Sequence, residues 1–186
     1  MEMNNDKPVV VKKYSALEYL SRHADCISKI LESEPFFAIV LTSCGIELMG
    51  KSISNCPSWS QDGQSEIDFN KVIVQCPAFK KYKAWKLEGF NLYDGLRCAP
   101  VHELSTKPQI VLMNKGDSYK DDTTNVLYVS ATDYFNAFNK AVEDLRKDKK
   151  RGKKTVLPDS KSYIKVATEG DMSITGTGIN DQWKFK

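Results

Sequence analysis

The chain has 186 residues, of which 41% are hydrophobic and 27% are charged, and its net charge is +3. This length suits one domain with an appendage, and the composition is that of an ordinary globular protein, which excludes a disordered or fibrous chain. Residues 146–154 form a concentrated basic strip, in which seven basic residues and one acidic residue give a net charge of +6 and leave −3 for the remainder of the chain.

Two helices are predicted in the first third of the chain, after a loose lead-in over residues 1–14. Ser15 and Glu18 have the spacing of a capping box, and apolar residues recur at helical spacing after them. Pro35 suits the first turn of a second helix, which should run to about Ile53. Because this second helix is apolar on most sides, we expect it at the centre of the fold.

Two further helical stretches are predicted after a turn-rich loop at residues 54–65. The first should begin near Ser65 and end before Pro77, which interrupts helical hydrogen bonding. The second covers residues 78–96, although two glycines interrupt its pattern. We therefore predict four helices before the strand-like segments that begin at residue 109.

A small β element is predicted before the last helix. Residues 109–113 and 125–129 are rich in β-branched and other apolar side chains, and a long polar loop joins them. We predict that they form an antiparallel hairpin. Ser130 and Asp133 then suit the start of a last helix, which runs into the basic strip.

The predicted fold class is mainly α, with a lead-in over residues 1–14, a helical domain over residues 15–148, and a basic strip with a weakly structured tail over residues 149–186. The longest uncharged apolar-rich stretch, residues 35–46, is too short to span a bilayer. The first residues contain no apolar run of the secretory type. We therefore expect no membrane association and a cytoplasmic location.

The cysteines and histidines do not have the spacing of a metal site, and we predict no metal and no cofactor. An odd number of cysteines without an export signal also argues against a disulfide framework. We expect reduced and mostly buried thiols. The residues concerned are Cys26, Cys44, Cys56, Cys76, Cys98, His23 and His102.

Arg97, followed five residues later by His102, is the strongest candidate for chemistry. An arginine can hold a phosphate with two parallel hydrogen bonds, and a histidine can move a proton near neutral pH. On an ideal helix an offset of five is about 140°, so the two side chains would not share a face. Pro100 between them predicts a break or kink that could bring both to one surface. Alternatively, Arg97 pairs with a nearby acid and His102 caps a helix end.

The block from Tyr93 to Glu103 reads Tyr-x-x-Leu-Arg-Cys-x-x-x-His-Glu. With this block and the order of helices and strands over residues 15–147, the chain resembles the HEPN superfamily, and more narrowly bacterial proteins that carry the same block. The resemblance implies a HEPN-like helical bundle with a small β-hairpin insertion before the last helix. It also implies metal-independent RNA cleavage at a site where two protomers meet. By position, Arg97 would bind the phosphate and His102 would be the acid or base.

Three further residues are candidates for supporting roles. Glu47 lies in the otherwise apolar second helix, where a buried carboxylate needs a partner, and Arg97 is the attractive one. The alternative is that Glu47 faces solvent at the edge of the helix. Tyr93 and Asp94, about a turn before Arg97, could orient it or contact a ligand, or they could be ordinary packing and solvent contacts.

The basic strip is a candidate RNA-binding segment, because lysines and arginines can hold phosphates with salt-dependent affinity. The alternative is a solvated helix terminus, where positive charge is favourable in any case. The residues proposed for RNA contact are Lys149, Lys150, Arg151, Lys153 and Lys154.

Three function hypotheses remain open. The first is a metal-independent endoribonuclease of the toxin or defence type, which uses Arg97 and His102 at a homodimer interface and has a cognate antitoxin or partner protein. The second is a non-catalytic dimeric HEPN-like module that binds a partner protein or a nucleotide. The third is a cysteine-dependent enzyme that uses Cys98 and His102. Geometry distinguishes them, because catalysis by the first route needs Arg97 and His102 accessible and close together.

Overall fold

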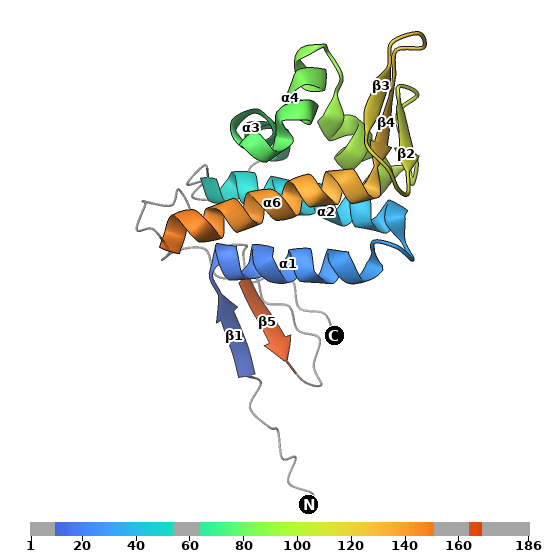
Figure 1. Cartoon of the computed structure of the whole chain (residues 1–186). Coiled ribbons are helices and arrows are strands. Elements are labelled where there is room, and N and C mark those ends of the chain that lie inside the picture. Colours follow the sequence, from blue (N-terminus) through green and yellow to red (C-terminus); the bar gives the residue numbers. More distant parts are fainter. Residues whose placement is uncertain (1–9, 54–63, 151–163, 169–186) are drawn as a thin grey trace, which may run out of the picture.

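The structure is a computed structural model of the whole chain, and it describes residues 10–53, 64–150 and 164–168. This part of the chain is mainly helical, as predicted, and carries a small sheet (Figure 1). In chain order its elements are β1 (Val10–Tyr14), α1 (Ala16–Ile30), α2 (Pro35–Ile53), α3 (Gln64–Gln75), the 3₁₀ turn η1 (Pro77–Phe79), α4 (Lys80–Leu87), the π-helical turn η2 (Asp94–Cys98), α5 (Ala99–His102), β2 (Ile110–Met113), β3 (Tyr119–Asp121), β4 (Val126–Ser130), α6 (Ala131–Lys150) and β5 (Ile164–Thr168).

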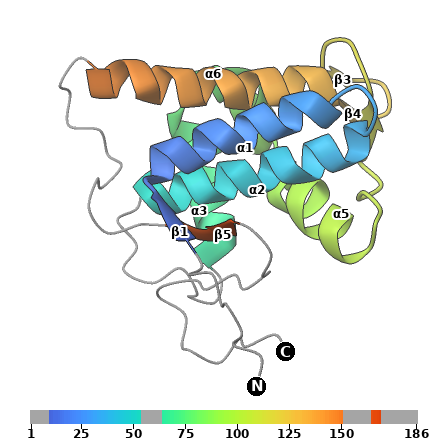
Figure 2. The ribbon, with the colours of Figure 1, turned by 90° about the horizontal axis from the view of Figure 1, so that it is seen from below.

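Helix α2 is the central element, as its apolar sequence predicts. It packs against α1, α3 and α6, and Figure 2 shows α1 and α6 running alongside it. Glycines on α2 permit this close packing. A Cβ atom at Gly50 would overlap the backbone of Asp68 on α3, and one at Gly45 would overlap the ring of Phe138 on α6. The absence of two side chains therefore sets the spacing of three helices.

Helix α1 begins where the capping box predicts. The backbone N–H of Glu18 donates to the Ser15 hydroxyl over 3.3 Å, and the backbone N–H of Ser15 donates to the Glu18 carboxylate over 2.8 Å. Two N–H groups without helical partners are thus satisfied. In the apolar stripe that follows, Leu20 and Ile27 are fully buried, while Ile30 at the end of the helix is partly buried.

The predicted continuous helix over residues 78–96 is wrong. Helix α4 ends at Leu87, and Gly89 adopts a φ of +99°, a left-handed conformation that glycine reaches without the usual steric cost. The N–H of Gly89 closes the end by donating to the Lys86 carbonyl over 3.1 Å. The chain changes direction there before η2 begins.

Of the break or kink predicted at Pro100, the break is absent. The chain stays helical through the proline, because the π-helical turn η2 lies directly before it and joins α5 without interruption. Pro100 has no N–H to donate to the Leu96 carbonyl. The hydroxyl of Ser43, on α2, donates to that carbonyl instead over 2.8 Å. Since Ser43 has one hydroxyl hydrogen, the Tyr134 hydroxyl of α6, 3.1 Å away, must donate to Ser43.

The predicted antiparallel hairpin over residues 109–129 is replaced by a different sheet. Its order is β2-β4-β3, in which β2 and β4 are parallel, while β3 arises from the predicted loop and pairs antiparallel with β4. Strand β4 takes the central position because it has the fully buried side chains Leu127 and Val129. The sheet lies at one end of α6 (Figure 1).

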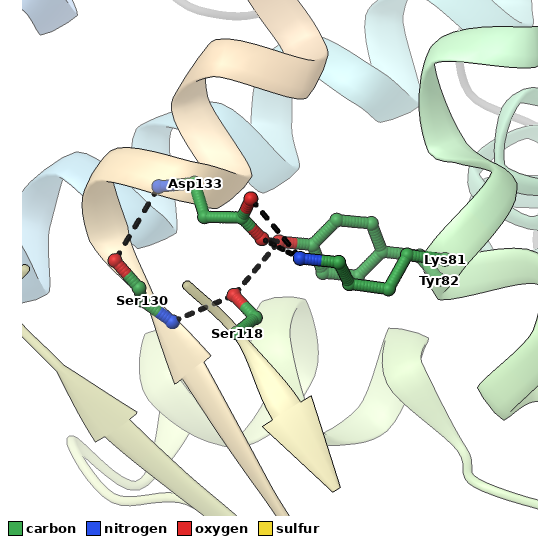
Figure 3. Close-up of polar contacts among 5 residues, drawn as sticks. All are labelled: Lys81, Tyr82, Ser118, Ser130 and Asp133. Atoms are coloured by element: carbon green, nitrogen blue, oxygen red, sulfur yellow. Dashed lines mark hydrogen bonds and ion pairs between the residues drawn. The ribbon is translucent and has the colours of Figure 1, made fainter. Parts of the chain in front are cut away.

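A polar cluster connects this sheet to the helices. The Tyr82 hydroxyl of α4 donates to the Asp133 carboxylate of α6 over 2.8 Å and lies 3.1 Å from the Ser118 hydroxyl (Figure 3). Ser118 accepts from the backbone N–H of Ser130 over 2.9 Å, and Lys81 pairs with Asp133 over 3.1 Å. Tyr82 and Ser118 are buried, and their hydrogen bonds are used within the cluster. We assign it a structural role.

The two ends of the chain meet in a second pairing. Strand β1 lies antiparallel to β5, with Val10 opposite Thr168 and Tyr14 opposite Ile164. The strand-like segment of the tail thus finds its partner in the lead-in. The other strand-like stretch of the weakly structured tail, residues 173–175, lies outside the described residues.

Candidate functional site

Arg97 and Glu47 form an ion pair between η2 and α2. The Arg97 Nε donates to Glu47 Oε2 over 2.9 Å, and only 7% of Glu47 is exposed to solvent. The alternative that Glu47 faces solvent is therefore excluded, and the pairing expected from the buried carboxylate is present. The π-helical turn that carries Arg97 is a rare conformation that occurs frequently at functional sites.

Glu47 is held by further donors. Lys51, one turn along α2, places Nζ 2.8 Å from Glu47 Oε1, and the Ser65 hydroxyl donates to the same oxygen over 2.7 Å. Burial raises the pKa of the Glu47 carboxyl, but the hydrogen bonds from Lys51 and Ser65 and the charges of Lys51 and Arg97 outweigh it, so the pKa lies below its usual value. Glu47 is ionised at neutral pH.

Arg97 has donors left for a ligand. Its Nε is used by Glu47, while Nη1 and Nη2 have no hydrogen-bond partner among the described residues. The side chain borders a pocket of about 250 Å³ that is open to solvent, between α1, α2 and η2. The lining residues are Tyr19, His23, Cys44, Glu47, Leu48, Lys51 and Arg97. A fixed arginine with free terminal groups is suited to binding an oxyanion.

His23 brings an imidazole into this pocket. Its Nε2 lies 2.7 Å from the Leu41 carbonyl, and because a carbonyl only accepts, Nε2 carries the hydrogen. Burial lowers the pKa of His23 below its usual value, although the bond to Leu41 opposes this shift. The ring is therefore neutral at pH 7, and Nδ1 is a hydrogen-bond acceptor. The ionised side chains of the lining, Arg97, Lys51 and Glu47, then give a net charge of +1.

His102 does not line this pocket. It is the last residue of α5, is exposed to solvent, and makes no hydrogen bond or ion pair within the described residues. Within one chain the structure thus joins Arg97 to Glu47 and His23, and leaves His102 on the adjoining surface. Sequence spacing could not reveal His23 and Lys51 as pocket residues, since α1 and α2 meet η2 only in the fold.

The supporting candidates Tyr93 and Asp94 lie outside the pocket lining. The Tyr93 ring packs edge-on against Phe69 of α3, with 5.6 Å between the ring centroids. Asp94 forms an ion pair with Lys107 over 3.6 Å. The Asp94 contact is of the ordinary solvent type that the sequence left as an alternative. Tyr93 lies close to the ion pair, because burial and the charge of Glu47 raise the pKa of its hydroxyl, while the charge of Arg97 and a hydrogen bond with Ser65 oppose this shift.

The basic strip is covered by the structure only at its beginning. Helix α6 extends to Lys150, so the backbone of Lys149 and Lys150 is helical. Arg151, Lys153 and Lys154 lie outside the described residues.

The cysteines in the described part are free thiols, as predicted. Their expected burial is wrong, because Cys26 is exposed and Cys44, Cys76 and Cys98 are partly exposed. Of these, Cys76 packs against the hydrophobic core from its edge. No hydrogen bond joins Cys98 to His102 among these residues, and Cys56 lies beyond them.

Two other site classes find no support in the described ranges. These residues contain no group of three or more histidine, cysteine, aspartate or glutamate side chains arranged to hold a metal ion. None of the helices in this part of the chain is long and apolar enough to span a membrane.

Comparisons with protein-family models, with characterised proteins and with solved structures gave no match to this chain.

Proposed function

We propose that the chain is a HEPN-like endoribonuclease of the toxin or defence type, which acts in the cytoplasm as a homodimer and needs no metal ion. Arg97 binds the scissile phosphate, and His102 transfers protons. His102 of one protomer takes the proton of the ribose 2′-hydroxyl, whose oxygen attacks phosphorus and displaces the 5′-oxygen. The His102 of the second protomer protonates that leaving oxygen, which yields a 2′,3′-cyclic phosphate and a 5′-hydroxyl.

The observation that carries this proposal is the fixed position of Arg97. Glu47 binds the Nε of Arg97 and leaves Nη1 and Nη2 free of partners in the described part of the chain. This contact holds the guanidinium at the border of an open pocket, where its remaining donors suit a two-pronged contact with a phosphate. Glu47 is thus a positioning residue for the phosphate-binding arginine.

The surroundings of His102 support a shared site. Val101 is 39% exposed and Leu104 is 74% exposed, so apolar side chains flank the histidine on the surface. Leu104 also has a φ of +50°, a conformation that is uncommon for a residue with a side chain. A two-fold interface presents the same patch twice, so an apolar patch here would bring two copies of His102 together.

An RNA-degradation assay with EDTA tests the proposal. The wild-type protein should cleave single-stranded RNA, while Arg97→Ala and His102→Ala should each lose activity, because charge stabilisation and proton transfer are separate tasks. Arg22→Ala, a change of an exposed arginine of α1 outside the pocket, is the matched control and should retain activity. Intact RNA across pH 6 to 9, or full activity of His102→Ala, would contradict the enzyme hypothesis.

A non-catalytic dimeric HEPN-like module that binds a nucleotide or a partner protein, such as an antitoxin, is the second candidate. The observation that favours it is the absence of His102 from the lining of the Arg97 pocket. Under this hypothesis Arg97→Ala weakens ligand binding and no variant changes RNA integrity.

A further inference from the structure

We propose that the pocket beside Arg97 holds one ribonucleoside monophosphate unit, the nucleotide that adjoins the phosphate bound by Arg97. The ligand class rests on the proposed function, whereas the pocket itself does not depend on His102 or on a second protomer. Tyr19, His23 and Lys51 are the residues that this assignment adds to the site.

One end of the pocket suits a phosphodiester. Arg97 and Lys51 each lie within 3 Å of the same carboxylate, that of Glu47, which neutralises one of their two positive charges. Among the described lining residues the ionised side chains of Arg97, Lys51 and Glu47 sum to +1, which suits an anionic group such as a phosphodiester. Nη1 and Nη2 of Arg97, which have no hydrogen-bond partner in the described ranges, supply parallel donors for its two non-bridging oxygens.

The other end of the pocket suits the nucleoside. The rings of Tyr19 and His23, one turn apart on α1, lie nearly parallel, with 6.1 Å between centroids and 15° between planes. Leu48 of α2 adds apolar surface. Aromatic faces of this kind take a base or a ribose by stacking, with little preference for sequence.

His23 also supplies a polar contact that a phosphate alone would not use. Since its Nε2–H donates to Leu41, its Nδ1 is an acceptor, and it has no hydrogen-bond partner among the described residues. An acceptor calls for a ligand with a donor, and the ribose hydroxyl is the donor that stands next to the phosphate in RNA. A ligand with both an anionic group and a hydroxyl therefore fits the lining best.

The size of the pocket limits the ligand to about one nucleotide. Its volume of about 250 Å³ lies just below the range typical of ligand sites, roughly 300–1,000 Å³. Because the pocket is open to solvent, an RNA strand can continue out of it toward the surface that carries His102.

Titration calorimetry in EDTA tests this assignment with four probes: adenosine 3′-monophosphate, uridine 3′-monophosphate, adenosine and inorganic phosphate. Both monophosphates should bind wild-type protein about tenfold or more tightly than adenosine or phosphate does, because only they occupy both ends. Tyr19→Ala and His23→Phe should each weaken monophosphate binding about tenfold. Phe37→Ala and Lys29→Met, which change exposed residues outside the pocket, should leave it unchanged.

Cys44 gives a second readout that needs no substitution. This half-buried thiol lines the pocket, while Cys26 on α1 is exposed and outside it. Adenosine 3′-monophosphate should slow alkylation of Cys44, measured by mass spectrometry at each site, and leave Cys26 unaffected. Equal reactivity of Cys44 with and without the nucleotide would overturn the assignment even if a variant failed to fold.

His102→Ala separates this inference from the proposed function. The variant should bind monophosphates as well as wild type does, because His102 does not line the pocket. If the wild-type protein binds monophosphates but does not cleave RNA, the ribonuclease hypothesis is rejected and the nucleotide-binding assignment stands. If the protein cleaves RNA but does not bind monophosphates, the nucleotide-binding assignment is rejected and the ribonuclease hypothesis stands. The same conclusion follows if Tyr19→Ala and His23→Phe leave monophosphate binding unchanged.

Discussion

At the scale of single residues, Glu47 shows how a buried charge is made tolerable. The carboxylate is surrounded by Arg97, Lys51 and Ser65, so its burial is offset by two opposite charges and a hydroxyl donor. Removing one partner of such a group costs more than the group itself contributes, because the remaining charges lose their compensation.

Glu47→Gln tests this compensation. The substitution keeps the shape but leaves Arg97 and Lys51 as two neighbouring positive charges, so we expect a loss of about 1–3 kcal/mol of unfolding free energy at pH 7. Urea titration measures it. RNA cleavage should fall as well, since Arg97 is no longer held in place. A variant as stable and as active as wild type would show that Glu47 has no positioning role.

The pH dependence of the same residue has a defined sign. The folded-state pKa of Glu47 is lowered, so its contribution is present above the unfolded pKa, about 4.3, and is lost as pH falls through the folded value. Urea titrations between pH 6 and pH 3 should therefore show a smaller loss of stability on acidification for Glu47→Gln than for wild type. If the unfolding free energies of wild type and Glu47→Gln fall by the same amount between pH 6 and pH 3, Glu47 is not responsible for the pH dependence.

At the scale of elements, η2 and α5 continue through Pro100 because α2 supplies the hydrogen-bond donor that the proline lacks. Ser43 donates to the Leu96 carbonyl, which is the bond that the proline cannot make. Arg97 lies in the same turn, so the packing of α2 against η2 determines both the backbone and the position of the guanidinium.

Ser43→Ala should destabilise the protein by about 1–3 kcal/mol, because a buried carbonyl and the Tyr134 hydroxyl both lose a partner. Ser28→Ala, which removes an exposed hydroxyl from α1, is the control and should change stability little. Thermal unfolding followed by circular dichroism measures both. In the Pro100→Ala background the cost of Ser43→Ala should be smaller, and equal costs in the two backgrounds would refute the link between serine and proline.

The crossing of α2 and α3 depends on Gly50. An alanine there would overlap the backbone of Asp68, which cannot rotate away as a side chain can, so we expect a loss of at least about 1–3 kcal/mol from overpacking. Gly116→Ala is the contrast, because that glycine has open space around it and only its φ of +97° opposes the change. Chemical denaturation of both variants should show the larger effect at Gly50.

At the scale of the whole molecule, the proposed function requires two copies. The exposed apolar residues Val101 and Leu104 flank His102, and this surface adjoins the η2 turn that carries Arg97. The same chain therefore offers a complete pocket in one protomer and, under our proposal, a proton-transfer site between two.

Leu104→Glu tests the two-protomer site. It should convert the proposed dimer to monomer in light scattering and abolish RNA cleavage, because a charge in an apolar interface is left without a partner. Leu87→Glu is the matched control, since Leu87 on α4 has the same 74% exposure as Leu104. Monophosphate binding should survive in both variants. If the wild-type protein is a monomer at all accessible concentrations, the hypothesis of a site shared between two protomers is rejected.

The sequence by itself determined α1, α2 and α6, because their signals are local. The capping box at Ser15, the apolar character of α2 and the start of α6 after Ser130 all reside in neighbouring residues, and each element lies where its pattern predicts. The partner of Glu47 was also predictable, since a carboxylate in an apolar helix needs a cation and the chain has few arginines.

Only the tertiary structure decided what depends on distant contacts. Pro100 signals a break, but Ser43, far away in the sequence, replaces the missing hydrogen bond and keeps the chain helical. Strand order in the sheet followed from which strand could be buried on the core. His23 entered the pocket because α1 packs beside α2, and His102 stayed outside because α5 ends at the surface. Such contacts have no fixed sequence spacing, so periodicity and motifs could not predict them.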